Sequence, residues 1–203
     1  MDQKKNGRPG FDRRMSRDEI NCCPILRWEG STIVVHDSAG LKEAMRKLAG
    51  ESLLGFDTET RPAYRKGESY PPSLLQLAGR DEVFIFQLRH LGLAAPLRKL
   101  LADPSVIKAG VGLDFDIREL QKLSRFKPAG FFDLGNLARE TGIRNHGLRG
   151  LAAVFLRMRI PKGAQTSNWA RDTLTPKQVL YAATDAWIGR RLYLAMQKVP
   201  DRD

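Results

Sequence analysis

The sequence predicts an α/β domain, and three observations carry this prediction. Apolar runs at residues 53–57, 73–78 and 83–86 are joined by short polar connections, a pattern typical of an antiparallel meander. A further apolar stretch at 106–109 leads through Gly110-Val111-Gly112 into a helical pattern. The second half of the chain is mostly helical by its apolar period. A sheet flanked by helices is therefore expected.

The size and composition favour one domain over residues 25–198. The chain has 203 residues, 42% of them apolar, which suffices for one well-filled core and is too little for two comfortable ones. Residues 1–24 are polar and charge-dense, so we expect a basic, disordered N-terminal tail. Cys22 and Cys23 are adjacent and cannot build a disulfide framework.

The charge balance points to a polyanionic partner. Lys and Arg number 34 against 23 Asp and Glu, giving a net charge of +11. This excess favours nucleic acid over an acidic small substrate or a neutral peptide, although basic proteins without such a partner also exist. The sequence has no run of about 20 apolar residues and no apolar signal segment, so we expect no membrane contact and a cytoplasmic location.

The elements of the first half follow from apolar spacing and turn residues. Residues 31–36 read as a short strand, and Asp37 or Ser38 can cap a helix that ends at Gly50. The strand that ends at Asp57 follows, and Gly79-Arg80-Asp81 joins the next two strands as a hairpin. Residues 91–101 are expected to form one helix.

The second half contains one short strand and three helices in this interpretation. The helix after Gly112 is expected from about Asp114 to Leu123, and residues 131–134 form a last short strand. Helices are expected at 147–158 and 176–196, where apolar residues recur with a helical period.

The stretch Phe56-Asp57-Thr58-Glu59-Thr60 carries the first candidate site residues. In a strand, Asp57 and Glu59 share one face about 6–7 Å apart, at ~3.3 Å per residue, whereas Thr58 points to the other face. Two carboxylates held together repel each other unless a cation or a proton compensates them, so a divalent metal is the natural partner. An ordinary solvated strand end is the alternative from these residues alone.

Two further acids lie in contexts that match such a site. Gly110-Val111-Gly112 resembles the start of a dinucleotide-binding fingerprint, but the acidic residue follows too soon, so we reject that interpretation. Asp114 is expected as a structural helix cap. Asp116 lies one turn further, near the positive helix end, where it can reach toward a cation.

A tyrosine and an aspartate lie on one face of the last helix. Tyr181 and Asp185 are four residues apart, with Cβ atoms ~5–6 Å from each other. The small residues Ala182 and Ala183 between them allow that helix to approach a neighbour closely. Trp169 and His146 are interpreted as structural residues.

Together, these segments resemble the three motifs of the DEDD superfamily of 3′-5′ exonucleases, tyrosine subclass. The motifs are Phe56-Asp57-Thr58-Glu59-Thr60, Gly110 to Asp116, and Tyr181-Ala182-Ala183-Thr184-Asp185. The last block, from Ser167-Asn168-Trp169 onward, is similar to the exonuclease domain of the Werner-syndrome helicase and to ribonuclease D. The resemblance covers about Trp28 to Met196.

The resemblance implies an RNase H-like fold with a mixed sheet of five to six strands. It also implies metal-dependent hydrolysis of DNA or RNA from the 3′ end, releasing 5′-mononucleotides by a two-metal mechanism. Two Mg²⁺ or Mn²⁺ ions would stabilise the attacking and leaving oxygens. Asp57 would bridge the two ions. Glu59 and Asp185 would hold the ion that carries the nucleophilic water, and Asp116 would hold the other ion. Tyr181 would orient that water.

Several residues are candidates for contact with the nucleic acid. Thr58, Gln76 and Arg118 lie in or near the motifs, and Arg118 stands where the Werner-like domain has an aromatic residue, so base stacking should differ. Residues 139–171 contain seven basic residues and one acidic residue, and a phosphate track there would include Arg149, Arg159 and Lys162. A solvated helix face is the alternative.

The runner-up function is a catalytically silent nucleic-acid-binding module on the same fold. That function would require the loss of at least one motif acid, and all four are present. A nucleotide-binding regulatory domain is a more distant possibility. The sequence does not decide whether the substrate is DNA or RNA, or whether it is a single strand or a recessed 3′ end.

Overall fold

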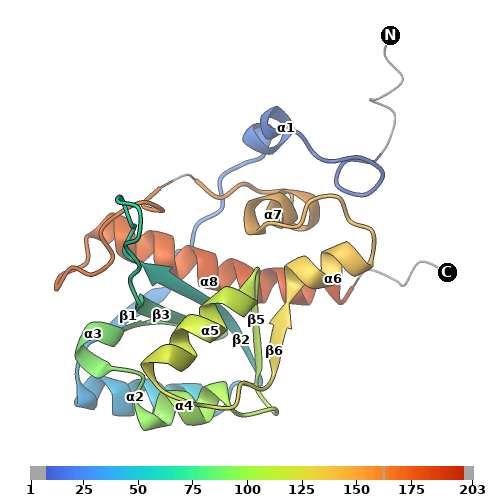
Figure 1. The fold of residues 1–203 in the computed structure, drawn as a ribbon. Coiled ribbons are helices and arrows are strands. Elements are labelled where there is room, and N and C mark those ends of the chain that lie inside the picture. The colour runs from blue at the N-terminus through green and yellow to red at the C-terminus, as the bar shows by residue number, and fades with distance from the viewer. Residues whose placement is uncertain (1–7, 162, 199–203) are drawn as a thin grey trace.

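A six-stranded mixed sheet forms the centre of the computed structural model, which describes residues 8–161 and 163–198 (Figure 1). The strands are β1 (Ser31–Val35), β2 (Leu53–Thr60), β3 (Pro72–Ala78), β4 (Glu82–Gln87), β5 (Ile107–Gly110) and β6 (Phe131–Asp133). Their order is β1-β4-β3-β2-β5-β6. The pairs β2–β3 and β3–β4 are antiparallel, and the other pairs are parallel. The predicted meander is therefore confirmed at the middle of the sheet.

Helices cover both faces of this sheet. They are α1 (Arg17–Cys22), α2 (Ser38–Leu48), α3 (Leu88–Leu91), α4 (Ala95–Leu101), α5 (Leu113–Leu123), α6 (Leu134–Glu140), α7 (Leu148–Leu156) and α8 (Pro176–Met196). Helices α2, α4 and α5 pack on the face that carries Leu54 and Phe56 of β2. Helix α8 crosses the opposite face, with α6 and α7 beside it. The two layers bury the first half of β2 (53–56) on both sides, whereas its second half (57–60) stays partly exposed.

The long helix α8 follows directly from its local sequence. Thr175 caps it by accepting from the backbone N–H of Gln178, the Gln178 side chain accepts from the Thr175 N–H, and Pro176 takes the first turn. Its predicted range is confirmed. Its small residues bring it close to β2, because a Cβ atom on Gly55 would lie 1.9 Å from the Ala186 carbonyl oxygen. Backbone therefore meets backbone where these two elements cross.

Two predictions in the middle of the chain are wrong in detail. The helix predicted for 91–101 is two helices, α3 and α4, because Gly92 adopts a φ of 57° and ends the first one. Asp114 is not a helix cap, because α5 begins one residue earlier and its cap position is Gly112. Helix α6 was not predicted from the sequence.

The predicted disordered tail over residues 1–24 is wrong from Arg8 onward, whereas residues 1–7 lie outside the described residues. Phe11 is 7% exposed and packs edge-on against Phe155, with 5.9 Å between ring centroids. Ser16 and Glu19 form a reciprocal capping box at the start of α1. One apolar anchor and one capped helix thus order a segment whose overall composition is that of a tail.

Candidate active site

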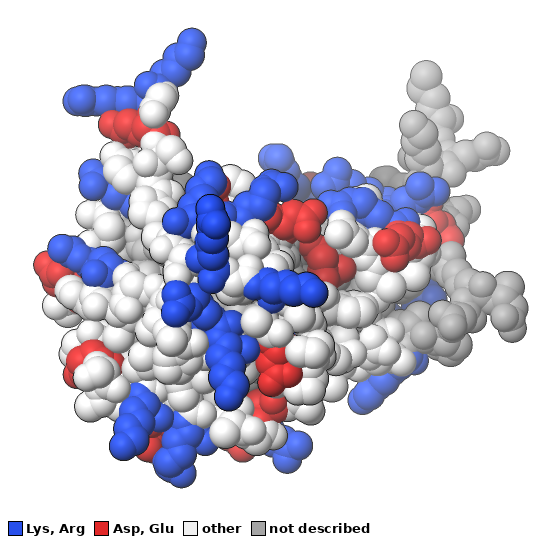
Figure 2. Space-filling model, turned by 60° about the horizontal axis from the view of Figure 1, so that its bottom comes forward, with Lys and Arg blue, Asp and Glu red and all other residues white. Residues whose placement is uncertain are grey.

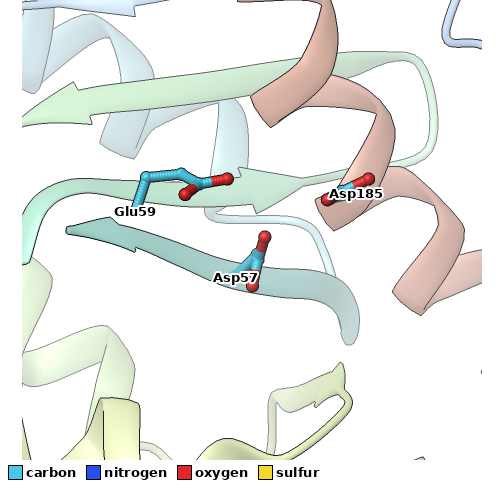
Figure 3. A group of neighbouring side chains, drawn as sticks. All are labelled: Asp57, Glu59 and Asp185. Carbon is cyan, nitrogen blue, oxygen red and sulfur yellow. The ribbon is translucent and has the colours of Figure 1, made fainter. Parts of the chain in front are cut away.

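Three carboxylates from two elements converge on one space beside the sheet. Asp57 and Glu59 project from β2 and Asp185 from α8 (Figure 3). One oxygen from each residue lies within 4.8 Å of the others. Asp57 and Glu59 share one face of the strand, as predicted, and that face is turned toward α8. The close contact between Gly55 and Ala186 brings Asp185 up to them.

Asp116 approaches this group from the other side of the sheet. It lies in the first turn of α5, and its Oδ1 accepts a hydrogen bond of 2.6 Å from the Thr58 hydroxyl. Thr58 points away from Asp57, as predicted, and therefore holds an acid of the opposite layer. The charge of Asp116 nevertheless raises the pKa of Asp57, so the four acids form one electrostatic system.

Burial and mutual repulsion make these acids hold protons tightly. Burial raises the pKa of Asp57 well above its ordinary value, and the charges of Asp185 and Asp116 raise it further. Burial, followed by the charge of Asp57, raises the pKa of Glu59 to about 10. Burial also raises the pKa of Asp185 to about 7, and it raises the pKa of Asp116. The negative charges of these acids are therefore not balanced by positive charge within the site.

Tyr181 lies one helical turn before Asp185 and is half-buried. A hydrogen bond from its hydroxyl lowers the pKa of Asp185 and so opposes part of the burial effect. Burial and the charge of Asp185 raise the pKa of the Tyr181 hydroxyl, which therefore stays protonated. Tyr181 can act in this site only as a neutral hydrogen-bonding group.

A divalent cation fits this donor set. The Oδ1 atom of Asp185 is buried and has no hydrogen-bond partner among the described residues. Buried carboxyl oxygens rarely lack a partner, and clustered carboxylates without a compensating cation are costly. All candidate ligand atoms are oxygens, which are the donors that hard cations prefer. Asp57, Glu59 and Asp185 are therefore suited to hold the metal, with Asp116 next to them.

The residues predicted to contact nucleic acid differ in their exposure to solvent. Gln76 is fully buried on β3 beside Asp57, so the prediction that it contacts a substrate is wrong. Thr58 is half-buried and bonded to Asp116. Arg118 is exposed on α5. Lys162 lies outside the described residues.

A cleft of about 1180 Å³ reaches the site, and Tyr181 and Asp185 line it. Arg149 and Arg159 line it, while their contact with nucleic acid stays a prediction, and the charge of Arg149 lowers the pKa of Asp185. The sequence interpretation missed Arg14 and Arg17, which line the same cleft from the N-terminal segment. The pattern Ser16-Arg17-Asp18-Glu19 is a capping-box signal that could have revealed that segment.

The basic side chains extend well beyond the cleft. Figure 2 shows the lower face of the molecule, where Lys and Arg side chains are spread among scattered acidic ones. The net charge of +11 is therefore distributed over the surface and supplies a general attraction to polyanions. Among the described helices, none is long and apolar enough to cross a membrane.

Comparison with known proteins identifies the sequence family and the fold. A family model described as "3′-5′ exonuclease" matches residues 32–200. The mouse bifunctional 3′-5′ exonuclease/ATP-dependent helicase WRN is 28% identical over 188 residues, covering 88% of this chain and 13% of that protein. Ribonuclease D of Gluconacetobacter diazotrophicus is 30% identical over 175 residues, covering 84% of this chain and 44% of that protein. The chain thus spans less than half the length of either relative.

The fold has close counterparts among solved structures. The Nibbler EXO domain of Aedes aegypti superimposes with a TM-score of 0.76 at 24% identity, covering 86% of this chain and 91% of that one. This likeness concerns the fold alone. The predicted RNase H-like fold with a mixed sheet is confirmed, and the observed sheet has six strands.

Proposed function

The chain belongs to the family of 3′-5′ exonuclease domains, and we propose that it hydrolyses nucleic acid stepwise from the 3′ end, releasing 5′-mononucleotides. The observation that carries this proposal is the convergence of Asp57 and Glu59 with Asp185, which lines a cleft that arginines also line. Three clustered acids suit a metal-dependent reaction, and a basic cleft suits a phosphodiester chain. A cytoplasmic location is also part of this proposal.

The acids are proposed to hold two divalent cations, either Mg²⁺ or Mn²⁺. When bound, such cations lower the pKa of a coordinated water and stabilise the charge on the attacking and leaving oxygens. Asp57, Glu59 and Asp185 offer ligand oxygens on the α8 side of the sheet, and Asp116 offers them from α5. The raised pKa values of these carboxyls mean that metal binding displaces protons from them.

Tyr181 is proposed to orient the attacking water or the scissile phosphate, which would place the chain in the tyrosine subclass. Its hydroxyl stays neutral because burial and the charge of Asp185 raise its pKa. It therefore positions a group by a hydrogen bond and does not remove a proton. The neighbouring bond to Asp185 fixes the direction of the hydroxyl.

The arginines of the cleft are proposed to bind the phosphates of the strand. Arg149 donates from Nη2 to the Ile160 carbonyl at 2.5 Å, which holds its guanidinium at the cleft wall. Guanidinium groups bind phosphate through two parallel hydrogen bonds, and a fixed one loses less entropy on binding. Affinity should therefore come largely from these basic groups, and cleavage from the acids.

A single assay tests the proposal. DNA and RNA oligonucleotides labelled at the 5′ end are incubated with the protein and either Mg²⁺, Mn²⁺ or EDTA, and the products are resolved by length. The expected result is a ladder that shortens from the 3′ end only with a divalent cation. Degradation in EDTA, or cleavage from the 5′ end or internally, would contradict the proposal.

A further inference from the structure

The N-terminal segment, residues 8–24, is docked firmly on the rest of the domain. The backbone N–H of Arg144 donates to the Gly10 carbonyl at 2.7 Å. The Asn145 side chain, 3% exposed, accepts from the Met15 N–H at 2.9 Å and donates to the Met15 carbonyl at 3.4 Å. A Cβ atom on Gly10 would lie 2.3 Å from a methyl group of Val154, so the segment touches α7 directly.

The other end of the segment is fixed by Arg159. The Arg159 N–H donates to the Pro24 carbonyl at 2.8 Å, and its Nε donates to the Cys23 carbonyl at 3.0 Å. The Leu26 N–H donates in turn to the Arg159 carbonyl at 2.8 Å. Between these two anchorages the chain runs over the top of the domain as α1 (Figure 1). The segment is therefore an ordered part of the domain, held by hydrogen bonds at both ends.

This segment forms one wall of the cleft that leads to Tyr181 and Asp185. From it, Arg14, Ser16, Arg17 and Asn21 line the cleft, and Arg149 and Arg159 are among the residues that line the remainder. The volume of about 1180 Å³ exceeds the roughly 300–1,000 Å³ of pockets that enclose one small ligand. The cleft thus has room for more of a strand than its terminal nucleotide.

The charges of the wall suit a phosphate backbone. Arg14 and Arg17 are exposed, whereas the neighbouring Arg13 is engaged with Glu19 at 2.5 Å. Asp185, at the base, is the one carboxylate among the residues that line this cleft. Cationic groups therefore face the cleft from two sides above a group of acids, an arrangement in which a polyanion bridges the walls.

We infer that Arg14 and Arg17 bind the phosphates of the substrate strand behind its 3′ end, and that this wall restricts the protein to single-stranded 3′ ends. A recessed 3′ end carries its complementary strand with it, and in this inference the wall leaves the cleft too narrow for that second strand. The inference rests on the proposed function. The segment lies outside residues 32–200 that match the family model.

Salt-dependent binding tests the phosphate contacts without any catalysis. The fluorescence anisotropy of a labelled single-stranded oligonucleotide is measured in EDTA over a range of salt for wild type and for the double variant Arg14→Ala/Arg17→Ala. Each phosphate contact on a single strand contributes about 0.7 to the slope of log K against log salt, so the slope should flatten by about 1.4. The matched control is Lys42→Ala/Arg125→Ala, which removes the same charge from exposed positions near α2 and α5.

An unchanged slope in the Arg14→Ala/Arg17→Ala variant, or equal flattening in the control, would overturn the inference. The strand preference is measured separately with a single-stranded substrate and a recessed duplex of the same sequence. Wild type should degrade the single strand at least about tenfold faster, and the Arg14→Ala/Arg17→Ala variant should lose most of that difference. Equal rates for the two wild-type substrates would also overturn it.

A small substrate separates this inference from the proposed function. The p-nitrophenyl ester of thymidine 5′-monophosphate contains one phosphodiester and is too short to reach the wall. If wild type hydrolyses neither the ester nor any oligonucleotide, the proposed function is wrong. If wild type hydrolyses both, the ratio of kcat/KM for the oligonucleotide to that for the ester should fall in the Arg14→Ala/Arg17→Ala variant. A constant ratio would contradict the role of the wall.

Discussion

The hydroxyl of Thr58 and the carboxylate of Asp116, 58 residues apart, are joined by a hydrogen bond of 2.6 Å on the α5 side of the sheet. Thr58 lies between Asp57 and Glu59 on β2 but points to the opposite layer. The strand that carries two of the acids therefore also fixes the position of the fourth.

Replacing Thr58 by valine should weaken metal binding while leaving the fold intact. Valine keeps the β-branched shape and removes the donor, so Asp116 loses its fixed orientation and a bond that lowers its pKa. Residues that orient metal ligands are typically worth about 10–100-fold in affinity or activity. The measurement is the Mn²⁺ dependence of cleavage, with Thr58→Ser as the matched control. Equal Mn²⁺ dependence in the valine variant and wild type would contradict the positioning role.

The stability of the metal-free protein should decrease as the pH rises. Asp185 has an ordinary pKa of 3.8 and a folded-state pKa of about 7. The folded state therefore holds this proton more tightly, and its contribution to stability is present below pH 3.8 and lost as the pH rises through about 7. In a chain of this size about 1 kcal/mol shifts the Tm by roughly 2–4 °C, so a drop of several degrees is expected. Thermal unfolding in EDTA between pH 5 and 8 measures it, and a Tm that rises over this interval would contradict it.

Asp57→Ala should abolish cleavage and stabilise the metal-free protein at neutral pH. In wild type, the charge of Asp57 raises the pKa of Glu59. The substitution removes this repulsion between the two carboxylates. A divalent cation should raise the Tm of wild type and have little effect on the variant. Calorimetry with and without Mn²⁺, together with the cleavage assay, tests this. A variant that still cleaves would remove Asp57 from the site.

Tyr181→Phe should slow cleavage without weakening metal binding. Phenylalanine keeps the ring that packs 5.9 Å from Trp169 and deletes only the hydroxyl. A positioning or proton-handling group typically contributes about 10²–10⁴ in rate, and the loss should fall within or somewhat below that range. Single-turnover cleavage measures it, and Asp185→Asn should differ by weakening metal binding as well. Wild-type cleavage by Tyr181→Phe would make the tyrosine a packing residue.

Asn145→Ala should release the N-terminal segment without unfolding the domain. The variant loses both hydrogen bonds to Met15, each worth about 0.5–1.5 kcal/mol. Local opening should become about tenfold more frequent or more, which trypsin detects by faster cleavage after Arg14 and Arg17. Asn136→Ala, at an exposed position of α6, is the control. Identical cleavage of the two variants would mean that Asn145 does not hold the segment.

The sequence predicted the acids, the central strands and α8 well because each depends on short-range chemistry. Alternation along β2 places Asp57 and Glu59 on one face, and the Thr175–Gln178 capping box marks the start of α8. Contacts between distant segments were not predictable in this way. The burial of Gln76 depends on α8 lying over the sheet, and the order of residues 8–24 depends on Phe11 reaching Phe155.

The contact between Gly55 and Ala186 divides the molecule into a fixed part and a replaceable part. Strand and helix touch there through backbone atoms, so no side chain is available to adjust the spacing between Asp57 and Asp185. The N-terminal wall, in contrast, is held by side-chain and backbone bonds on the far side of the cleft from the sheet. Evolution or design could therefore exchange the wall, and with it the choice of strand, while the chemistry beneath it stayed the same.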